Sequence, residues 1–92
     1  MAALLQDKVI LITGSSRGIG AALAIGLAEY GGKIIINYNN SRTKAENVLA
    51  KVSEISPNSI IVQFDVSKKN EVRTSIKKII DKFGRLDVLI NN

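Results

Sequence analysis

One glycine-rich segment, residues 13–20, narrows the folds open to this chain more than any other part of the sequence. It follows a short apolar run, Val9–Thr13, whose β-branched residues predict a strand buried on both faces. It leads into Ile19–Tyr30, where abundant Ala and Leu predict a helix that stops at Gly31–Gly32. A strand, a glycine turn and a helix in this order are typical of a phosphate-binding element, because the start of the helix presents free N–H groups and the positive end of its dipole.

The three glycines of this turn have separate expected roles. Gly14 allows a tight turn that a side chain would hinder. Gly18 has no Cβ, so the backbone can approach a pyrophosphate closely, and Gly20 lets the new helix pack near the strand. The spacing is Gly-x-x-x-Gly-x-Gly rather than the Gly-x-Gly-x-x-Gly of the general dinucleotide fingerprint. For a glycine turn taken alone, the alternative is an ordinary helix-entry loop that binds no ligand.

The rest of the chain continues the alternation of strands and helices. Between the predicted strands, Ser41 is expected to cap a helix that runs to about Ile55, and Ser67 to cap one that ends at Gly84. The four strands are predicted at Val9–Thr13, Lys33–Tyr38, Ser59–Phe64 and Leu86–Ile90. Strands that alternate with helices indicate an α/β fold with a parallel sheet and right-handed crossovers.

This order of elements predicts one partial, doubly wound Rossmann-type domain over residues 1–92. The strands are then arranged 3-2-1-4, with the first two helices on one face of the sheet and the third on the other. The fourth strand lies at an edge, although Val88, Leu89 and Ile90 have the composition of a buried central strand. Because an exposed apolar edge is a pairing hazard, we expect the chain to be truncated, with further strands following in a longer protein. A homo-oligomer formed through this strand is a separate prediction.

The spacing of the turn resembles that of the short-chain dehydrogenase/reductase family, whose turn is Thr-Gly-x-x-x-Gly-x-Gly. Asp65-Val66 after the third strand, and Leu89-Ile90-Asn91-Asn92 at the fourth, are similar to two further landmarks of that family. The residue sequence of the turn, Gly-Ser-Ser-Arg-Gly-Ile-Gly, most resembles that of the classical branch of the family, which includes the 3-oxoacyl-[acyl-carrier-protein] reductases. The resemblance covers essentially the whole chain. It implies the cofactor-binding part of an oxidoreductase that transfers a hydride between a nicotinamide and a carbonyl or alcohol carbon of a small-molecule substrate.

The residues after the second predicted strand indicate which dinucleotide is bound. NAD-selective sites place an Asp or Glu there, and this chain has none between Asn37 and Arg42. Arg17, in the glycine turn, and Arg42 could both bind a 2′-phosphate, with added hydrogen bonds from Ser41. We therefore expect NADP(H) in preference to NAD(H), and the resemblance implies the same. The alternative for Arg42 is a solvent-exposed side chain without a ligand.

The resemblance also implies roles for the residues that follow the third and fourth strands. It implies that Asp65 faces the adenine amino group with Val66 beside the ring, and that Asn91 and Asn92 hold the strand ends and line the cofactor ribose. The alternative for Asp65 is a strand end or a helix cap. The complete set of expected cofactor-binding residues is Gly14, Ser16, Arg17, Gly18, Ile19, Gly20, Tyr38, Asn39, Ser41, Arg42, Asp65, Val66, Asn91 and Asn92.

No catalytic residue is expected in this chain. The family's proton comes from a tyrosine in a Tyr-x-x-x-Lys motif, helped by an upstream serine. Tyr30 is followed four residues later by Ile34, and Tyr38 by Arg42, so neither fits the motif. The oxidoreductase activity that the resemblance implies is therefore expected of a longer parent protein, and this chain alone is expected to be inactive. A non-catalytic NADP(H)-binding module or a truncated paralogue remains the alternative, and an S-adenosylmethionine-binding domain is the nearest relative to exclude.

Composition excludes several other classes of function. The chain has no cysteine and no histidine, so disulfides, thiolate sites and the commonest metal ligand are missing, and no metal site is expected. The longest uncharged stretch, Ile19–Ala28, is too short to span a bilayer, so no membrane partner is expected. The net charge of +5 suggests a nucleic-acid-binding module, but such proteins usually pair basic grooves with aromatic stacking surfaces, and two of the four aromatics, Phe64 and Phe83, are expected to be buried, so no nucleic acid is expected. A cytoplasmic location fits best; an organelle stays open if a transit peptide has been removed.

Overall fold

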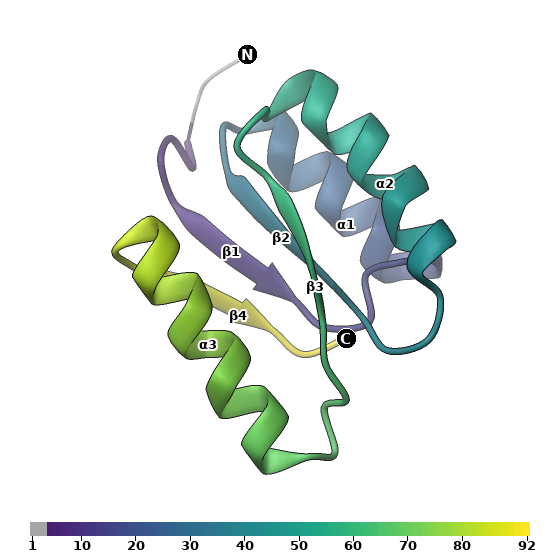
Figure 1. The fold of residues 1–92 in the computed structure, drawn as a ribbon. Helices are drawn as coiled ribbons and strands as arrows, with labels where there is room; N and C mark the ends of the chain where they lie inside the picture. Colours follow the sequence, from purple (N-terminus) through teal and green to yellow (C-terminus); the bar gives the residue numbers. More distant parts are fainter. Residues whose placement is uncertain (1–3) are drawn as a thin grey trace.

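The computed structural model describes residues 4–92, in which four strands and three helices alternate along the chain (Figure 1). In chain order the elements are β1 (Val9–Ile12), α1 (Gly18–Glu29), β2 (Lys33–Tyr38), α2 (Arg42–Ile55), β3 (Ile60–Gln63), α3 (Lys69–Phe83) and β4 (Val88–Ile90). Every predicted element is present, and its ends lie within two residues of the predicted ends. Among residues 4–92, none of the helices has both the length and the apolar character needed to cross a membrane.

The strands form one parallel sheet in the order β3-β2-β1-β4, which confirms the predicted arrangement. β1 lies between β2 and β4, with Val9 opposite Lys33 on one side and Ile10 opposite Val88 on the other. Because all four strands run in the same direction, their carboxyl ends meet at one edge of the sheet. The loops that follow β1, β2 and β4 are thereby brought together at this edge.

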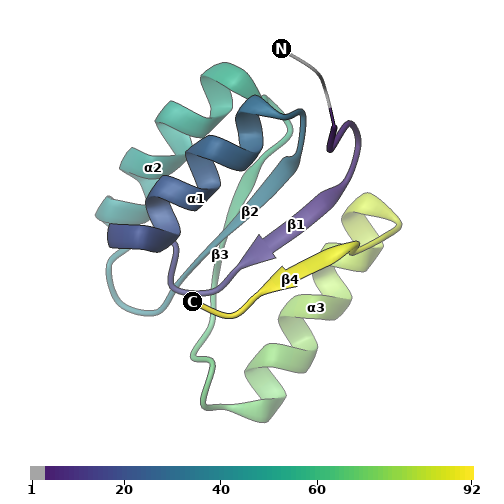
Figure 2. The same ribbon diagram turned by 180° about the vertical axis from the view of Figure 1, so that it is seen from behind.

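Helices cover both faces of the sheet, as predicted (Figures 1 and 2). Successive strand residues point to opposite faces, so Ile10 and Ile12 pack under α1 and α2, whereas Val9 and Leu11 pack under α3. This separates the buried residues into two cores, one on each side of the sheet. A strand buried on both faces needs a continuous apolar run, and the sequence of β1 supplies one.

The start of β1 is fastened to β4 by a carboxylate that the sequence analysis did not single out. The Val9 N–H donates to Asp87 Oδ2 at 2.8 Å, and the Asp87 N–H donates to the Val9 carbonyl at 2.9 Å. The Arg85 guanidinium donates two hydrogen bonds to the same carboxylate, from Nε to Oδ2 at 2.8 Å and from a terminal nitrogen to Oδ1 at 2.7 Å. These hydrogen bonds, that from Arg85 above all, lower the pKa of Asp87 below its usual value.

One detail of the helices differs from the sequence prediction. α3 has Lys68 at its N-cap position, one residue later than predicted, because the Ser67 N–H and hydroxyl both bond Asp65 instead. On the same helix, Ile80 is 44% exposed, whereas the neighbouring Ile79 is buried. Ser41 does hold the N-cap position of α2, although among residues 4–92 its hydroxyl makes no capping bond.

β4 forms the edge of the sheet that the strand order predicts. Its composition is that of a buried strand, yet Val88 and Leu89 are 37% and 48% exposed. Within residues 4–92, β4 is paired on one side, with β1, and α3 lies on one face of the sheet beside it (Figures 1 and 2).

Candidate functional site

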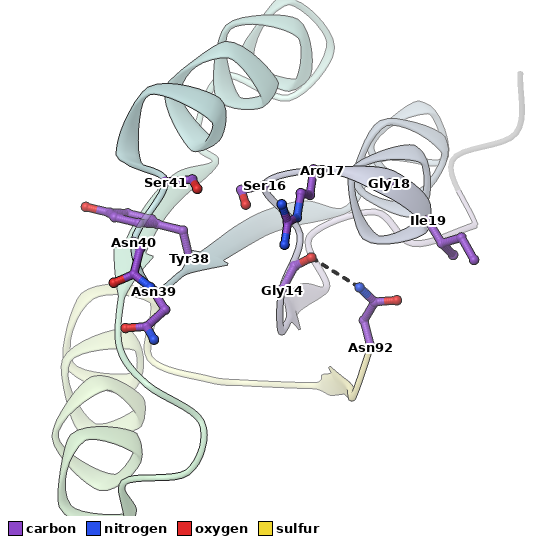
Figure 3. Close-up of a pocket in the computed structure, with 10 residues that line it drawn as sticks. All are labelled: Gly14, Ser16, Arg17, Gly18, Ile19, Tyr38, Asn39, Asn40, Ser41 and Asn92. Atoms are coloured by element: carbon purple, nitrogen blue, oxygen red, sulfur yellow. Dashed lines mark hydrogen bonds between the residues drawn. The ribbon is translucent and has the colours of Figure 1, made fainter.

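A cavity of about 500 Å³ opens at the carboxyl ends of β1 and β2, beside the start of α1 (Figure 3). Its walls come from three segments that are distant in sequence: the glycine turn, the loop between β2 and α2, and the residues after β4. The lining residues are Gly14, Ser16, Arg17, Gly18, Ile19, Tyr38, Asn39, Asn40, Ser41 and Asn92. All of them except Asn40 belong to the expected cofactor-binding set.

The backbone of the turn has the conformation that its glycines allow. Gly14 and Gly18 both have φ near +60°, in the left-handed region that favours glycine. A Cβ added to Gly18 would meet no atom within 4 Å, so this part of the backbone faces open space at the cavity. Gly20 is different, since a Cβ there would lie 2.7 Å from both the Gly14 carbonyl oxygen and Asn92 Nδ2. Gly20 therefore lies behind the turn, where it permits the close packing of α1.

The start of α1 leaves backbone donors directed at the same place. The first bond of the helix runs from the Ala21 N–H to the Arg17 carbonyl, at 3.2 Å. The amides of Gly18, Ile19 and Gly20 come before this bond and are among the donors that a helix start leaves without internal partners. The first turn of α1 also carries no acidic side chain to compete for these donors.

This set of groups fits a bound phosphate. Free amides, the positive end of a helix dipole and the Arg17 guanidinium all favour an anion. No carboxylate is among the lining residues. The space beside Gly18 is open because glycine has no side chain; any other residue at this position would fill part of it. Among residues 4–92, no group of three or more potential protein ligands is placed to hold a metal ion.

A buried polar network under the turn was missed by the sequence analysis. Asn37 Oδ1 accepts from the Gly14 N–H at 2.9 Å, and Asn37 Nδ2 donates to the Phe64 carbonyl at 3.1 Å. The Ser15 hydroxyl donates to the Ile12 carbonyl at 2.7 Å and accepts from the Asn37 N–H at 3.1 Å. The available signal was a polar residue that directly follows three isoleucines in a buried strand.

Asn92 joins the end of β4 to the turn. Its N–H donates to Thr13 Oγ1 at 3.0 Å, and its Nδ2 donates to the Gly14 carbonyl at 3.1 Å, the bond drawn in Figure 3. Thr13 continues the pairing of the two strands, since its N–H donates to the Ile90 carbonyl at 3.0 Å. These bonds join the end of β4 to the end of β1 and to the glycine turn.

The two arginines expected to bind a 2′-phosphate lie in different places. Arg17 is exposed and lines the cavity, and within residues 4–92 no carboxylate lies within ion-pair distance of it. Arg42 does not line this cavity. Its guanidinium donates to the Tyr38 hydroxyl at 3.0 Å and lies 3.7 Å from a carboxylate oxygen of Glu46. The structure therefore brings Arg17, but not Arg42, to the mouth of the glycine turn.

Asp65, Val66 and Asn91 also lie outside the main cavity. Asp65 Oδ1 accepts from the Ser67 hydroxyl at 2.7 Å and from the Ser67 N–H at 2.9 Å, which lowers the pKa of this carboxyl. Val66 is 60% exposed. Together with Asn91 and Leu89, it lines a separate apolar hollow of about 100 Å³ on the α3 side of the sheet.

Comparison with known proteins identifies the family. The model for short chain dehydrogenases matches residues 8–92, nearly the whole chain. The chain belongs to the short-chain dehydrogenase family. The match includes all the residues that line the main cavity, so the glycine turn and the end of β4 are part of the family's pattern.

Individual relatives agree with this assignment. The chain is 46% identical over 88 residues to a 3-oxoacyl-[acyl-carrier-protein] reductase of Synechocystis, and 42% identical over 87 residues to one of Staphylococcus epidermidis. These alignments cover 96% and 95% of this chain. Among solved structures, a short-chain dehydrogenase of Burkholderia cenocepacia in complex with NADP is 40% identical, with a TM-score of 0.90 over 96% of this chain.

This short-chain dehydrogenase chain spans only part of the proteins it matches. It covers 36% of the length of each of the two curated relatives and 36% of the Burkholderia chain. Within that part, the likeness extends over the four-stranded sheet and its three helices.

Proposed function

We propose that this chain is the NADP(H)-binding part of a short-chain oxidoreductase that reduces carbonyl groups or oxidises alcohols. The observation that carries the proposal is the cavity at the carboxyl ends of β1 and β2, where the open backbone at Gly18, the free amides at the start of α1 and Arg17 converge. The family match over residues 8–92 supports it, as does the NADP complex of the Burkholderia neighbour.

The glycine turn would hold the pyrophosphate. The amides of Gly18 and Ile19, both at the cavity wall, would donate to phosphate oxygens, and the side chain of Ser16 can add a further hydrogen bond. When bound, NADP(H) supplies the hydride donor or acceptor for the reaction. The contribution of this chain is to bind the cofactor and fix its orientation.

Charge at the cavity supports NADP(H) over NAD(H). Arg17, Asn39 and Ser41 all line the cavity, and no lining residue is an acid that would repel a 2′-phosphate. We assign the 2′-phosphate to Arg17 and Ser41. The hydrogen bond of Arg42 to the Tyr38 hydroxyl, beside its ion pair with Glu46, supports a positioning role at the edge of this site, through the tyrosine that lines the wall.

The segments after β3 and β4 would complete the cofactor site. Asp65 and Val66 remain our candidates for the adenine, and Asn91 and Asn92 for the ribose. Val66 and Asn91 already line one apolar hollow, which has a composition suited to the face of a ring. Ionised Asp65 provides an acceptor for an amino group, since its pKa is lowered by the Ser67 hydrogen bonds.

The reaction itself is assigned to the parent protein. Its substrate is a small molecule with a carbonyl or alcohol group, and the relatives named as 3-oxoacyl-[acyl-carrier-protein] reductases make a 3-oxoacyl thioester the leading candidate.

Calorimetric titration of the chain with NADPH and NADH tests the proposal. We expect saturable binding that is tighter for NADPH. Arg17→Ala should weaken NADPH binding about tenfold, because one charge-assisted hydrogen bond is lost, and should change NADH binding far less. Arg73→Ala, an equal charge change at an exposed position of α3, is the matched control and should change neither.

Two outcomes would count against the proposal. Absence of binding by a chain that circular dichroism shows to be folded would contradict the assignment of the cavity. An equal loss for both dinucleotides in Arg17→Ala would mean that Arg17 contacts the pyrophosphate rather than the 2′-phosphate.

A further inference from the structure

Asn37 is a buried polar residue in a strand that otherwise has an apolar interior. Its exposure is 2%, and the three residues before it are isoleucines with an exposure of 0% each. Burying a carboxamide is costly unless its hydrogen bonds are made inside the protein. Both polar side-chain atoms of Asn37 have partners inside the protein, and no buried side-chain nitrogen or oxygen in residues 4–92 lacks one.

The partners of the Asn37 side chain fix its orientation. Oδ1 faces the Gly14 N–H at 2.9 Å, a group that can only donate. Nδ2 faces the carbonyl oxygens of Phe64 at 3.1 Å and Tyr38 at 3.3 Å, which can only accept. Exchanging the oxygen and nitrogen would place donor against donor and acceptor against acceptor. The side chain therefore bridges the glycine turn and the segment that follows β3 in one orientation.

The backbone of Asn37 holds the next residue of the turn. Its carbonyl accepts from the Ser15 N–H at 3.0 Å, and its N–H donates to the Ser15 hydroxyl at 3.1 Å. Two successive amides at the base of the turn, those of Gly14 and Ser15, are thus engaged by one residue of β2. The donors left open are those at the start of α1, from Gly18 onward.

We propose that Asn37 is a positioning residue of the cofactor site, which ties the base of the glycine turn to the end of β3 so that the phosphate-binding amides are held in place before the cofactor arrives. The inference rests on the function proposed above. Gly14 has no Cβ and a positive φ, so without a tie the turn has more conformational freedom to lose on binding. Holding it in advance lowers that cost and strengthens binding. Because the same side chain also bonds the Phe64 carbonyl, it fixes the position of the backbone just before Asp65 and Val66.

Asn37→Asp tests this role because it preserves size and shape. The variant keeps an oxygen for the Gly14 N–H but replaces the amide donor with a second acceptor that faces two carbonyl oxygens. Protonation of the carboxyl restores one donor. We expect the affinity for NADP⁺, relative to wild type at the same pH, to fall about tenfold at about pH 8 and to return to within about threefold at about pH 5. Asn47→Asp, the same change at an exposed position of α2, should have the same affinity for NADP⁺ as wild type at both pH values.

A second measurement uses the wild-type chain, so it does not depend on the folding of a variant. The Gly14 amide proton should exchange slowly with solvent in the free chain, as followed by NMR, because the bond to Asn37 exists before any ligand is bound. Exchange as fast as that of an exposed loop amide such as Asn40 would overturn the proposal. So would a folded Asn37→Asp chain whose relative affinity is unchanged at both pH values. If the wild-type chain itself fails to bind NADP⁺, the proposed function fails, which is a distinct result.

Discussion

Replacing Gly20 with alanine tests the packing of α1 against the glycine turn. The added Cβ would lie 2.7 Å from the Gly14 carbonyl oxygen, 2.7 Å from Asn92 Nδ2 and 2.9 Å from Ser15 Cα. Two of these three contacts are with backbone atoms, which cannot rotate away as a flexible side chain can. The clash can be relieved only if α1 moves away from the turn or the turn itself changes shape.

The same helix contains a natural reference for the size of the effect. A Cβ added to Gly26 would meet nothing within 4 Å, so Gly26→Ala should gain the ordinary helix preference of alanine, about 0.5–1 kcal/mol. At Gly20 the same preference is opposed by overpacking, which typically costs about 1–3 kcal/mol and falls at the upper end where backbone must move. Because the alanine preference is common to both, the two variants should differ in unfolding free energy by the overpacking cost, about 2–3 kcal/mol, with Gly20→Ala the less stable.

Urea unfolding followed by far-ultraviolet circular dichroism measures this difference directly. The slope of the transition should be unchanged for both variants, because the area exposed on unfolding is the same. Gly20→Ala should also weaken NADPH binding, whereas Gly26→Ala should not. The reasoning is refuted if Gly20→Ala is as stable as wild type, since the described approach of α1 to the turn would then be wrong.

Two further predictions concern stability. Ser59→Ala leaves the buried Ile34 N–H without the acceptor that it has at 2.9 Å, so thermal unfolding should show a loss of about 1–3 kcal/mol, whereas Ser53→Ala on α2 should change little. The folded-state pKa of Asp87 is lowered, chiefly by Arg85, so its stabilisation is present above the unfolded-state pKa of about 3.9 and is lost as the pH falls through the folded-state pKa. Wild type should therefore lose more resistance to urea between about pH 5 and about pH 3 than Asp87→Asn; equal losses would contradict this.

Much of the fold could be predicted because its signals are local. The apolar run of β2 and the glycine stops after α1 and α3 each depend on a few neighbouring residues. Strand order then follows from the general rules for crossovers and for doubly wound sheets. The capping of α3 differs from the prediction, because the Ser67 hydroxyl bonds the carboxylate of Asp65, two residues before it, instead of the start of the helix.

The candidate site was predictable where it is built from contiguous sequence. The glycine turn and the loop after β2 line the cavity as expected. The roles of Asn37 and Ser15 were not found, because their partners come from three different strand ends. Arg42 stays a prediction as a phosphate ligand: one helix turn places Glu46 beside its guanidinium, which also donates to the Tyr38 hydroxyl.

The bonds between β1 and β4 have a consequence for how the chain folds. Asp87 meets Val9 across 78 residues, and Asn92 meets Thr13 across 79. Contacts of such long sequence separation form late, since the intervening chain must first lose its freedom. The β1–α1–β2 unit is held by much more local contacts, so we expect it to form early and β4 to dock last. Asn92 reaches the Gly14 carbonyl only in that final step, so the phosphate site should be completed by the slowest event in folding.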